Sequence, residues 1–464
     1  MVSLAGQSAG AADPEPLRLH PDNPHYFLFR GEPTVIIGSG EHYGAVLNLA
    51  FEYVKYLETL QRDGMNHTRL FVGPYCEADT SFNIVCNTLA PAAGRFICAW
   101  ARSDVPGYAN GGNKFDLTRW DEAFFARLRD FVAQAGRCGV IVEVNLFCPF
   151  YGEEQWALSP FNPSNNVNDI GAVDRGDVYR LDGHSGLLAI QEQMVRKVVG
   201  ELQDFDNLYY EIMNEPYIRK VPLDWERHIA AVIMDAQSAS AARHLISQNI
   251  ANGKAEVTDP DPNVSVLNFH YAWPPETVGL NYGLGRVIGD NETGFRGTAD
   301  LHYRREAWAF MVAGGGLYSN LDYSFTVGHE DGSFELPEKQ PGGGGPSLRQ
   351  QLRILSDFLR GFDFVRMAPL PEALKGELAD GLSGFVLGEA GRQYGVYLCH
   401  DQPQPQATSA ELLLELPAGT YLVTWVDTLT GAKEAEQRVR HEGGALSLTS
   451  PPFAEDLALR VVGA

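Results

Sequence analysis

Short apolar runs alternate with longer segments of helical periodicity along most of this chain, and this alternation restricts the possible folds more than any other feature. Eight runs have the length and composition of buried strands: residues 34–40, 65–73, 140–147, 207–214, 244–249, 264–270, 286–292 and 316–325. Helical patterns separate several of them, as at residues 51–64, 121–139, 188–203 and 224–239. Eight strand-then-helix units in succession predict an α/β fold, the (β/α)8 TIM barrel.

A doubly wound open sheet is the alternative α/β fold. Such sheets usually contain fewer repeats and carry a glycine-rich phosphate-binding turn after the first strand. The corresponding stretch here, "GSGEHYG" at residues 38–44, lacks the dinucleotide-binding spacing. The pattern therefore favours the barrel.

The last quarter of the chain has a different character from the rest. Residues 370–464 contain short alternating strands separated by turn signals, which are typical of a small all-β sandwich of immunoglobulin-like type. We therefore expect a flexible leader at 1–24, a catalytic barrel at 25–365 and a β-sandwich accessory domain at 370–464. No obvious row of exposed aromatic residues is apparent in this last segment, so a structural role is favoured over carbohydrate binding.

The charge balance excludes some classes of partner. The chain has 36 basic and 59 acidic residues, a formal net charge of −23, which argues against nucleic acid and anionic membranes as partners. No window approaches 18 continuous apolar residues, so no membrane span is expected. The first residues lack a basic, then apolar, signal pattern, which predicts a cytoplasmic protein, or a secreted or periplasmic one if a signal was removed. The sequence does not indicate the oligomeric state.

Six cysteines occur without CxxC or metal-finger spacing: Cys76, Cys86, Cys98, Cys138, Cys148 and Cys399. One disulfide among the first three is compatible with the sequence. Cysteine usage does not decide the compartment.

Three connections are much longer than barrel loops usually are, at residues 74–120, 148–187 and 326–346. Each follows a predicted strand, so all three should lie on the C-terminal face of the barrel, where such folds have their active sites. Four of their aromatic residues could either stack on sugar rings or pack the loops: Trp100, Tyr108, Trp156 and Phe161.

Two glutamates end predicted strands in the same way. Glu215 follows the fourth strand, in "NLYYEIMNEPY", and Glu292 closes the seventh, in "RVIGDNETGF". Strands four and seven lie on opposite sides of an eight-stranded barrel, so their tips can place two carboxylates across the central cleft. A separation of roughly 5 Å is typical of a retaining glycosidase, in which one acid protonates the leaving oxygen and the other attacks the anomeric carbon. Burial is expected to raise the pKa of Glu215 so that it holds a proton.

The order of these motifs resembles that of the clan A retaining glycoside hydrolases, and in particular the cellulases of glycoside hydrolase family 5. The resemblance covers residues 25–365 and rests on Asn-Glu-Pro after strand four and a glutamate after strand seven. It implies that Glu215 is the acid/base and Glu292 the nucleophile. It also implies that no metal or cofactor takes part.

Further residues match the pattern of the same family. Arg69 in "MNHTRL" would keep the nucleophile ionised, and Asn214 would contact the sugar 2-hydroxyl. The stretch "NFHYAWP" supplies His270 and Tyr271 as substrate-binding residues. His42, next to Glu41 at the tip of strand one, is expected to face the same cleft.

The sequence also departs from the family pattern. Family 5 members usually separate the histidine and tyrosine by one residue, whereas His270 and Tyr271 are adjacent, so only one of them is expected to point into the site. The tryptophan expected after strand eight is missing from "NLDYSFTVGHEDG". Asp322, Tyr323 or Trp273 could replace it as part of the sugar-binding surface.

Other classes of protein fit less well. A metal-dependent hydrolase could use His42, His270, Asp290 and Glu292, but such sites usually have a His-x-His pair on the first strand and "EHYG" has one histidine. A non-catalytic sugar-binding barrel would lack one of the two acids.

The predicted function is a retaining β-glycoside hydrolase that acts on a carbohydrate. The sequence favours internal cleavage of β-1,3- or β-1,4-linked glucan. An exo-acting β-glycosidase on short oligosaccharides and a transglycosylase with the same site remain open.

Overall fold

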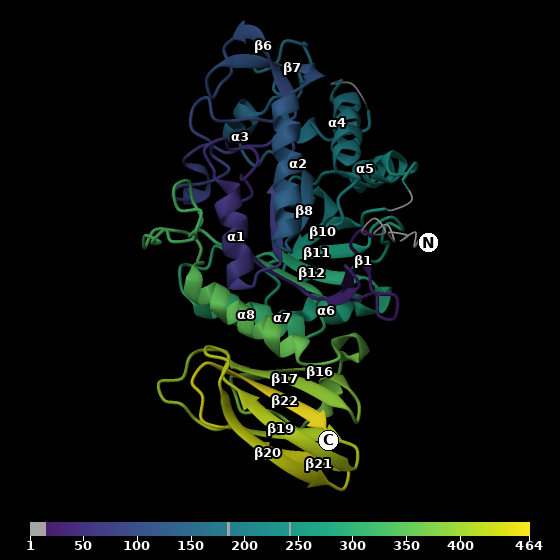
Figure 1. The fold of residues 1–464 in the computed structure, drawn as a ribbon, viewed down its shortest axis with the longest axis vertical. Helices are drawn as coiled ribbons and strands as arrows, with labels where there is room; N and C mark the ends of the chain where they lie inside the picture. Colours follow the sequence, from purple (N-terminus) through teal and green to yellow (C-terminus); the bar gives the residue numbers. More distant parts are fainter. Residues whose placement is uncertain (1–14, 183–185, 241–242) are drawn as a thin grey trace, which may run out of the picture.

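The computed structural model describes residues 15–182, 186–240 and 243–464. A barrel of parallel strands surrounded by helices forms the larger part of the molecule, and a smaller unit of antiparallel strands lies against its helices α7 and α8 (Figure 1). Most of the predicted leader, residues 1–14, lies outside the described residues. Its last part contains strand β1 (Arg18–Leu19).

The barrel sheet confirms the eight predicted strands. They are β4 (Ile36–Gly40), β5 (His67–Phe71), β8 (Ile141–Phe147), β9 (Leu208–Met213), β10 (Ile246–Asn252), β11 (Val266–His270), β12 (Val287–Glu292) and β13 (Leu317–Leu321). All neighbouring strands are parallel, in the order β4-β13-β12-β11-β10-β9-β8-β5. The register pairs Arg69 of β5 with Glu143 of β8, for example. The fold class is therefore that of a TIM barrel.

The seam between β4 and β5 is closed by a side chain as well as by the backbone. Asn66 donates from its amide nitrogen to the Val35 carbonyl at 2.9 Å and accepts from the Ile37 amide at 2.8 Å. Its backbone amide also donates to the Ile37 carbonyl at 3.2 Å. The asparagine thus satisfies backbone groups that would otherwise be unpaired at a sheet edge.

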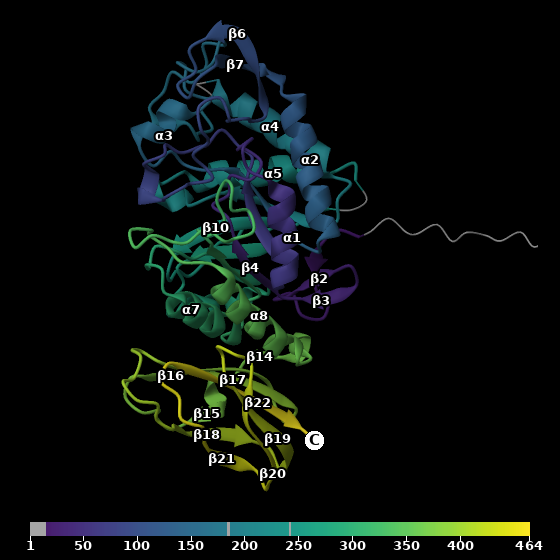
Figure 2. The ribbon, with the colours of Figure 1, turned by 60° about the vertical axis from the view of Figure 1, so that its left-hand side comes forward.

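The N-terminal end of the barrel is closed by a small antiparallel sheet of β1, β2 (Phe27–Phe29) and β3 (Glu32–Thr34), which lies beside the base of the barrel in Figure 2. Phe27 and Leu17 are fully buried there. They pack against apolar side chains at the starts of the barrel strands: Ile36, Ile141, Tyr209, Val266, Val287 and Leu317.

Helices cover the outside of the barrel. They are α1 (Tyr53–Asp63), α2 (Glu122–Arg137), α4 (Leu187–Leu202), α5 (Leu223–Ala236), α6 (Glu276–Asn281), α7 (Asp300–Val312) and α8 (Pro346–Arg360). Local signals fix their ends: Asp121 caps α2 by accepting from two backbone amides, and α1 ends at Gly64 with a left-handed φ of 82°. Among the described residues, no helix combines the length and apolar character needed to span a membrane.

The long connections contain structure of their own. The first forms a hairpin of β6 (Trp100–Pro106) and β7 (Asn113–Trp120), which lies at the end of the molecule farthest from the C-terminal unit (Figures 1 and 2). The second contains helix α3 (Glu153–Leu158). Trp100, Tyr108, Trp156 and Phe161 are all buried, and Trp100 lies 5.1 Å from Phe161 between ring centroids. These aromatic residues therefore pack the loops.

The C-terminal unit consists of two antiparallel sheets, in agreement with the predicted β-sandwich. One contains β14 (Ala368–Pro369), β16 (Leu382–Glu389), β17 (Gln393–His400), β22 (Asp456–Gly463), β19 (Gly419–Val426) and β20 (Lys433–His441); the other contains β15 (Leu374–Lys375), β18 (Glu411–Leu416) and β21 (Gly444–Thr449). Alternating side chains of β18 are buried and exposed, as expected for a strand with one face in a core.

Helix α7 joins the two units. Arg304 binds Asp456 through two hydrogen bonds of 3.0 and 2.8 Å, and Trp308 stacks on Tyr397 at 5.5 Å. Ten consecutive residues of this helix, 303–312, are buried, because the barrel covers one side and β16 and β17 the other.

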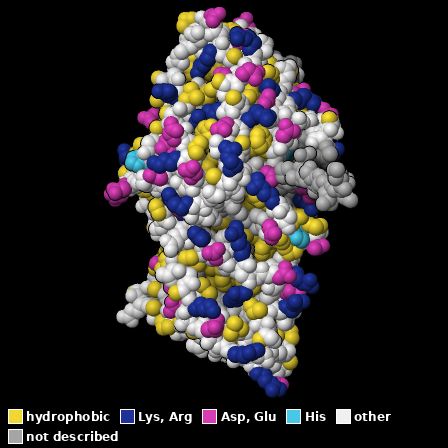
Figure 3. All heavy atoms as spheres, in the orientation of Figure 1, with side chains coloured by type: hydrophobic (Ala, Val, Ile, Leu, Met, Phe, Trp, Pro, Cys, Tyr) yellow, Lys and Arg dark blue, Asp and Glu magenta, His cyan; other side chains and the backbone are white. Residues whose placement is uncertain are grey.

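One face of the molecule carries charges of both signs (Figure 3), and all six cysteines are free thiols. On the face drawn in Figure 3, basic and acidic side chains are interspersed rather than gathered by sign. The disulfide that the sequence allowed among Cys76, Cys86 and Cys98 is not formed; Cys76 and Cys98 are buried and Cys86 is exposed.

One buried carboxyl on α5 yields a prediction about stability. Burial raises the pKa of Glu226 to about 8, and Gln248 donates the one hydrogen bond described for its carboxyl, at 3.1 Å. The folded state therefore binds this proton more tightly than the unfolded state, whose pKa is near 4.5. The proton therefore stabilises the fold fully when the pH is below the pKa of the unfolded carboxyl. This stabilisation is lost as the pH rises through about 8, the pKa in the folded state.

Glu226→Gln should remove this pH dependence. We expect the melting temperature of the variant to rise relative to wild type by about 2–4 °C between pH 5 and pH 8.5. Glu58→Gln, at an exposed position of α1, is the control and should show no such trend. If the melting temperatures of Glu226→Gln and wild type differed by the same amount at both pH values, the raised pKa of Glu226 would be contradicted.

Candidate active site

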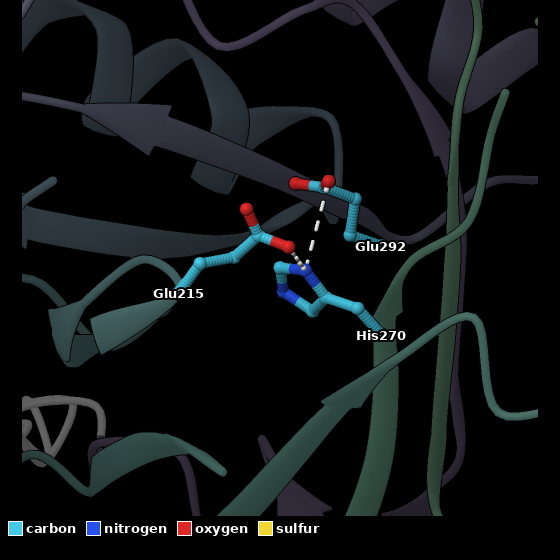
Figure 4. Close-up of side chains that lie close together, drawn as sticks. All are labelled: Glu215, His270 and Glu292. Atoms are coloured by element: carbon cyan, nitrogen blue, oxygen red, sulfur yellow. Dashed lines mark hydrogen bonds and ion pairs between the residues drawn. The ribbon is translucent and has the colours of Figure 1, made fainter. Parts of the chain in front are cut away.

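Glu215 and Glu292 stand at the C-terminal ends of β9 and β12 and face one cavity of about 550 Å³. Between them lies His270, whose Nδ1 is 3.3 Å from Glu215 Oε1 and 3.6 Å from Glu292 Oε1 (Figure 4). The ligand atoms of these three residues lie within 4.8 Å of one another. The two carboxylates therefore approach each other as closely as a retaining displacement requires.

Three donors hold the carboxylate of Glu292. Tyr271 donates its hydroxyl to Oε1 at 2.6 Å, Tyr43 donates to Oε2 at 2.7 Å, and Nη1 of Arg69 donates to Oε2 at 3.1 Å. Such contacts favour the ionised form of a carboxyl and fix its orientation.

Arg69 lies beneath this carboxylate, almost completely buried. Burial by itself would lower the pKa of the guanidinium. The charges of Glu211, Glu143 and Glu292 nevertheless keep this pKa well above its usual value. Arg69 also donates to Asn214 Oδ1 at 2.7 Å and to Glu211 Oε2 at 2.7 Å. It therefore links both strand tips.

Glu215 sits in a sharp turn, with a left-handed φ of 39°. Its amide donates to Asn249 Oδ1 at 2.9 Å, which holds the turn, and Tyr151 donates its hydroxyl to Glu215 Oε2 at 2.5 Å. A non-glycine residue in this backbone region is uncommon and often occurs at functional sites.

The expected rise in the pKa of Glu215 is wrong. Burial alone would raise this pKa, but hydrogen bonds and charge from His270, with a hydrogen bond from Tyr151, lower it to about 2. The two carboxylates in turn raise the pKa of the His270 imidazole, although its burial opposes this. Nδ1 of His270, 3.3 Å from Glu215 Oε1, therefore lies close enough to exchange a proton with this carboxylate.

His270 and Tyr271 both point into the site, contrary to the expectation for adjacent strand residues. The register between β11 and β12 shifts between Phe269 and His270, and Tyr271 has a left-handed φ of 53°. This irregularity interrupts the alternation of the strand and turns both side chains to the same side.

Two further predicted residues line the cavity. Asn214 donates its amide to the Tyr151 hydroxyl at 2.7 Å, and His42 Nε2 lies 3.2 Å from Glu77 Oε2. Glu41 has a structural role instead, because its carboxylate accepts from the amides of Gly44 and Ala45.

Trp273 does not join the other predicted site residues. It lies outside this cavity, where Arg305 stacks on its ring at 5.0 Å and Phe385 of the C-terminal unit is 6.5 Å away. The chain turns outward after Tyr271 and carries the indole toward β16. Asp322 forms an ion pair with Arg349 at 2.6 Å and does not contact the two glutamates. The Tyr323 ring lies nearer the cavity, with its centroid 5.9 Å from that of His42.

The metal set considered from the sequence is not assembled. Within the described residues, the one group with metal-ligand geometry is Glu215, His270 and Glu292, whereas Asp290 accepts from the Ala272 amide. A cation at this group would compete with the Arg69 guanidinium for Glu292. The donor set is therefore better satisfied by the protein's own cation and hydroxyls.

Comparisons with known proteins agree on the fold. No protein-family model and no curated protein matches the sequence. A candidate glycoside hydrolase from Bacteroides vulgatus superimposes with a TM-score of 0.67 at 13% identity, over 98% of this chain and 84% of that one. A glycoside hydrolase family 5 structure from the same organism gives 0.63 at 12% identity, over 97% and 93%. The chain has a fold found in glycoside hydrolase family 5.

A third glycoside hydrolase structure matches at a TM-score of 0.64 and 13% identity, over 97% of both chains. The shared fold thus covers the barrel and the C-terminal unit together.

Several residues of the site have no evident signal in the sequence. Tyr43 and Tyr151 each donate to one of the two glutamates, and Glu77, Asn252 and Phe295 also line the cavity. All but Asn252, the last residue of β10, lie in loops, where no periodicity predicts which way a side chain points. The position of Tyr43, two residues after Glu41 at a strand tip, is the one clue that the sequence offered.

Proposed function

We propose that this protein is a retaining β-glycoside hydrolase in which Glu292 is the nucleophile and Glu215 the general acid/base. The observation that carries the proposal is the close approach of the two carboxylates, whose ligand atoms lie within 4.8 Å of each other at opposite strand tips. Inverting enzymes need a wider gap, about 6.5–9.5 Å, to admit a water molecule.

In the first step, a carboxylate oxygen of Glu292 attacks the anomeric carbon and the bond to the leaving oxygen breaks. Glu215 gives a proton to that oxygen, which leaves as an alcohol, and the sugar remains bound as an ester of Glu292. In the second step, Glu215 takes a proton from water, whose oxygen attacks the same carbon and releases Glu292. Two inversions give net retention.

The surrounding residues support these steps. Glu292 loses its charge when the ester forms, and Arg69 remains neutralised because Glu211 is also hydrogen-bonded to it. His270 supplies the proton to Glu215 before the first step, over the 3.3 Å between Nδ1 and Oε1. In this proposal Asn214, which lines the cavity next to Glu215, binds the sugar 2-hydroxyl.

The substrate that we propose is a neutral β-linked glycoside. Aromatic rings form much of the cavity wall, including those of Tyr43, Phe71, Tyr75, Tyr151 and Tyr271. Apolar ring faces suit the C–H faces of sugars. A transglycosylase would use the same residues and differ in how well water competes at the second step.

Proton NMR of the first product tests the proposal. The purified protein is incubated with 4-nitrophenyl β-glucoside, β-mannoside, β-galactoside and β-xyloside. We expect at least one to be hydrolysed, with the β-anomer appearing first and the α-anomer forming later by mutarotation. Initial release of the α-anomer would refute the retaining mechanism, and no hydrolysis of any β-glycoside would refute the proposed substrate class.

A further inference from the structure

Two of the long loops are joined over one side of the barrel mouth. The Gln340 side chain accepts from the Val85 amide at 2.8 Å and donates to the Val85 carbonyl at 3.5 Å. Gln340 is almost fully buried, so this is an internal contact. One loop follows β5 and the other follows β13, and both strands neighbour β4 in the barrel. The joined loops therefore cross the mouth above β4.

This covered side is where the cleaved sugar would extend. Glu215, on β9, protonates the leaving oxygen, so the leaving group lies toward β9. The sugar attacked by Glu292 then extends the opposite way, toward β4, β5 and β13. An internal unit of a polysaccharide would need an open path in that direction for the rest of its chain.

Glu77 and His42 form a polar pair on the cavity wall at this covered side. The carboxylate of Glu77 accepts from Tyr75 at 3.0 Å and from Asn87 at 2.5 Å, and lies 3.2 Å from His42 Nε2. Stacking against Tyr43 at 5.3 Å also holds the His42 ring.

His42 still has an unused polar atom. Its Nδ1 is buried and has no hydrogen-bond partner among the residues that the structure describes, and the residue is 8% exposed. A buried polar atom without a partner is costly unless a ligand satisfies it. A carboxylate beside an imidazole nitrogen offers the combination of acceptors that neighbouring sugar hydroxyls require.

We infer that the enzyme is exo-acting and removes one terminal sugar at a time, with Glu77 and His42 binding the hydroxyls farthest from the anomeric carbon. This inference rests on the proposed retaining hydrolase function and specifies its substrate class. In an internal sugar, one of those hydroxyls would be replaced by a glycosidic bond to the next unit, which the joined loops exclude. The favoured substrates are thus the non-reducing ends of short β-linked oligosaccharides, in place of the internal glucan bonds that the sequence favoured.

Two exposed rings stand at the rim of the cavity, and one of them belongs to the loop after β5 itself. Phe82 and Phe295 are 38% and 40% exposed, and their ring centroids lie 6.3 Å apart. Phe82 also contacts Tyr151 at 5.3 Å, and Tyr151 binds Glu215. These exposed rings offer a stacking surface for the substrate at the cavity rim.

The test uses the β-linked pentasaccharide of whichever sugar is active as a 4-nitrophenyl glycoside, together with the 4-nitrophenyl monoglycoside itself. We expect wild type to release the monosaccharide and the tetrasaccharide as the first products. Glu77→Gln should lower kcat/KM on the monoglycoside by about 100-fold, because a charged acceptor for hydroxyls is lost. Asp79→Asn, which removes an exposed carboxylate from the same loop, should leave kcat/KM unchanged.

Two results would overturn the inference while leaving the hydrolase assignment intact. One is early release of di- and trisaccharides from the pentasaccharide by wild type, and the other is a kcat/KM for folded Glu77→Gln within twofold of wild type. The wild-type product pattern decides the question even if Glu77→Gln does not fold. By contrast, loss of retention in the NMR experiment would overturn the proposed function itself.

Discussion

Glu292→Ala should reduce kcat by about 10⁵-fold on every glycoside that wild type hydrolyses. The variant lacks the oxygen that attacks the anomeric carbon, and its neighbours Tyr43, Tyr271 and Arg69 cannot replace it as nucleophiles. Sodium azide should restore part of the activity, because the small anion fits the space left by the carboxylate. The product should be the α-glycosyl azide, since azide attacks once, from the nucleophile's side. Chromatography and NMR of the product measure both effects.

Glu211→Gln is the matched control for this experiment. Glu211 also binds Arg69, through a 2.7 Å hydrogen bond, but lies one layer deeper in the barrel. Its loss should weaken activity without creating azide rescue. Azide rescue in Glu211→Gln, or full activity in Glu292→Ala, would contradict the assignment of the nucleophile.

Glu215→Ala should produce an effect that depends on the leaving group. For a poor leaving group such as methanol, loss of the acid should lower kcat/KM by about 10⁴-fold. For 2,4-dinitrophenolate, which needs no proton to leave, kcat/KM should stay within about tenfold of wild type. Deglycosylation should still be slow, because the base that activates water is missing.

Azide distinguishes the two glutamates. With Glu215→Ala and a dinitrophenyl glycoside, azide should accelerate turnover by attacking the Glu292 ester, and the product should be the β-glycosyl azide. The configuration is thus opposite to that expected for Glu292→Ala. An equal loss of kcat/KM for both leaving groups would show that Glu215 is not the general acid.

The barrel could be predicted from sequence because its signal is repeated and local. Strands such as β8 and β9 are buried along their whole length and consist mainly of apolar residues. Glu215 and Glu292 were found for the same reason, since a strand fixes the position of the residue at its tip. Arg69 could be identified from the sequence because it is a charged residue within a predicted buried strand.

What the sequence could not predict depends on irregular backbone. The orientation of Tyr271 results from a register shift and a left-handed φ, which no residue pattern announces. Trp273 was placed in the site because of its nearness in sequence, but two residues of turn carry it to the C-terminal unit. Tyr43 and Tyr151 reach the glutamates from loops whose paths are set by tertiary packing.

The proton balance of the site was also beyond sequence reasoning. Burial alone would raise the pKa of Glu215, but hydrogen bonds and charge from His270, with a hydrogen bond from Tyr151, lower it. That arrangement requires strands β9, β11 and β12 to bring three tips together. This arrangement of Glu215, His270 and Glu292 can be recognised only from the three-dimensional positions of the three strands.

The burial of helix α7 on both sides limits how the two units can be separated or exchanged. Shortening the chain before residue 370 would leave Trp308 uncovered and Arg304 without Asp456. The sandwich thus serves as part of the outer wall of the barrel rather than as an appended module. Joining this barrel to another accessory domain would also require the face of β17 and the residues at the start of β22 that contact α7. The two units should therefore be kept together when the protein is engineered.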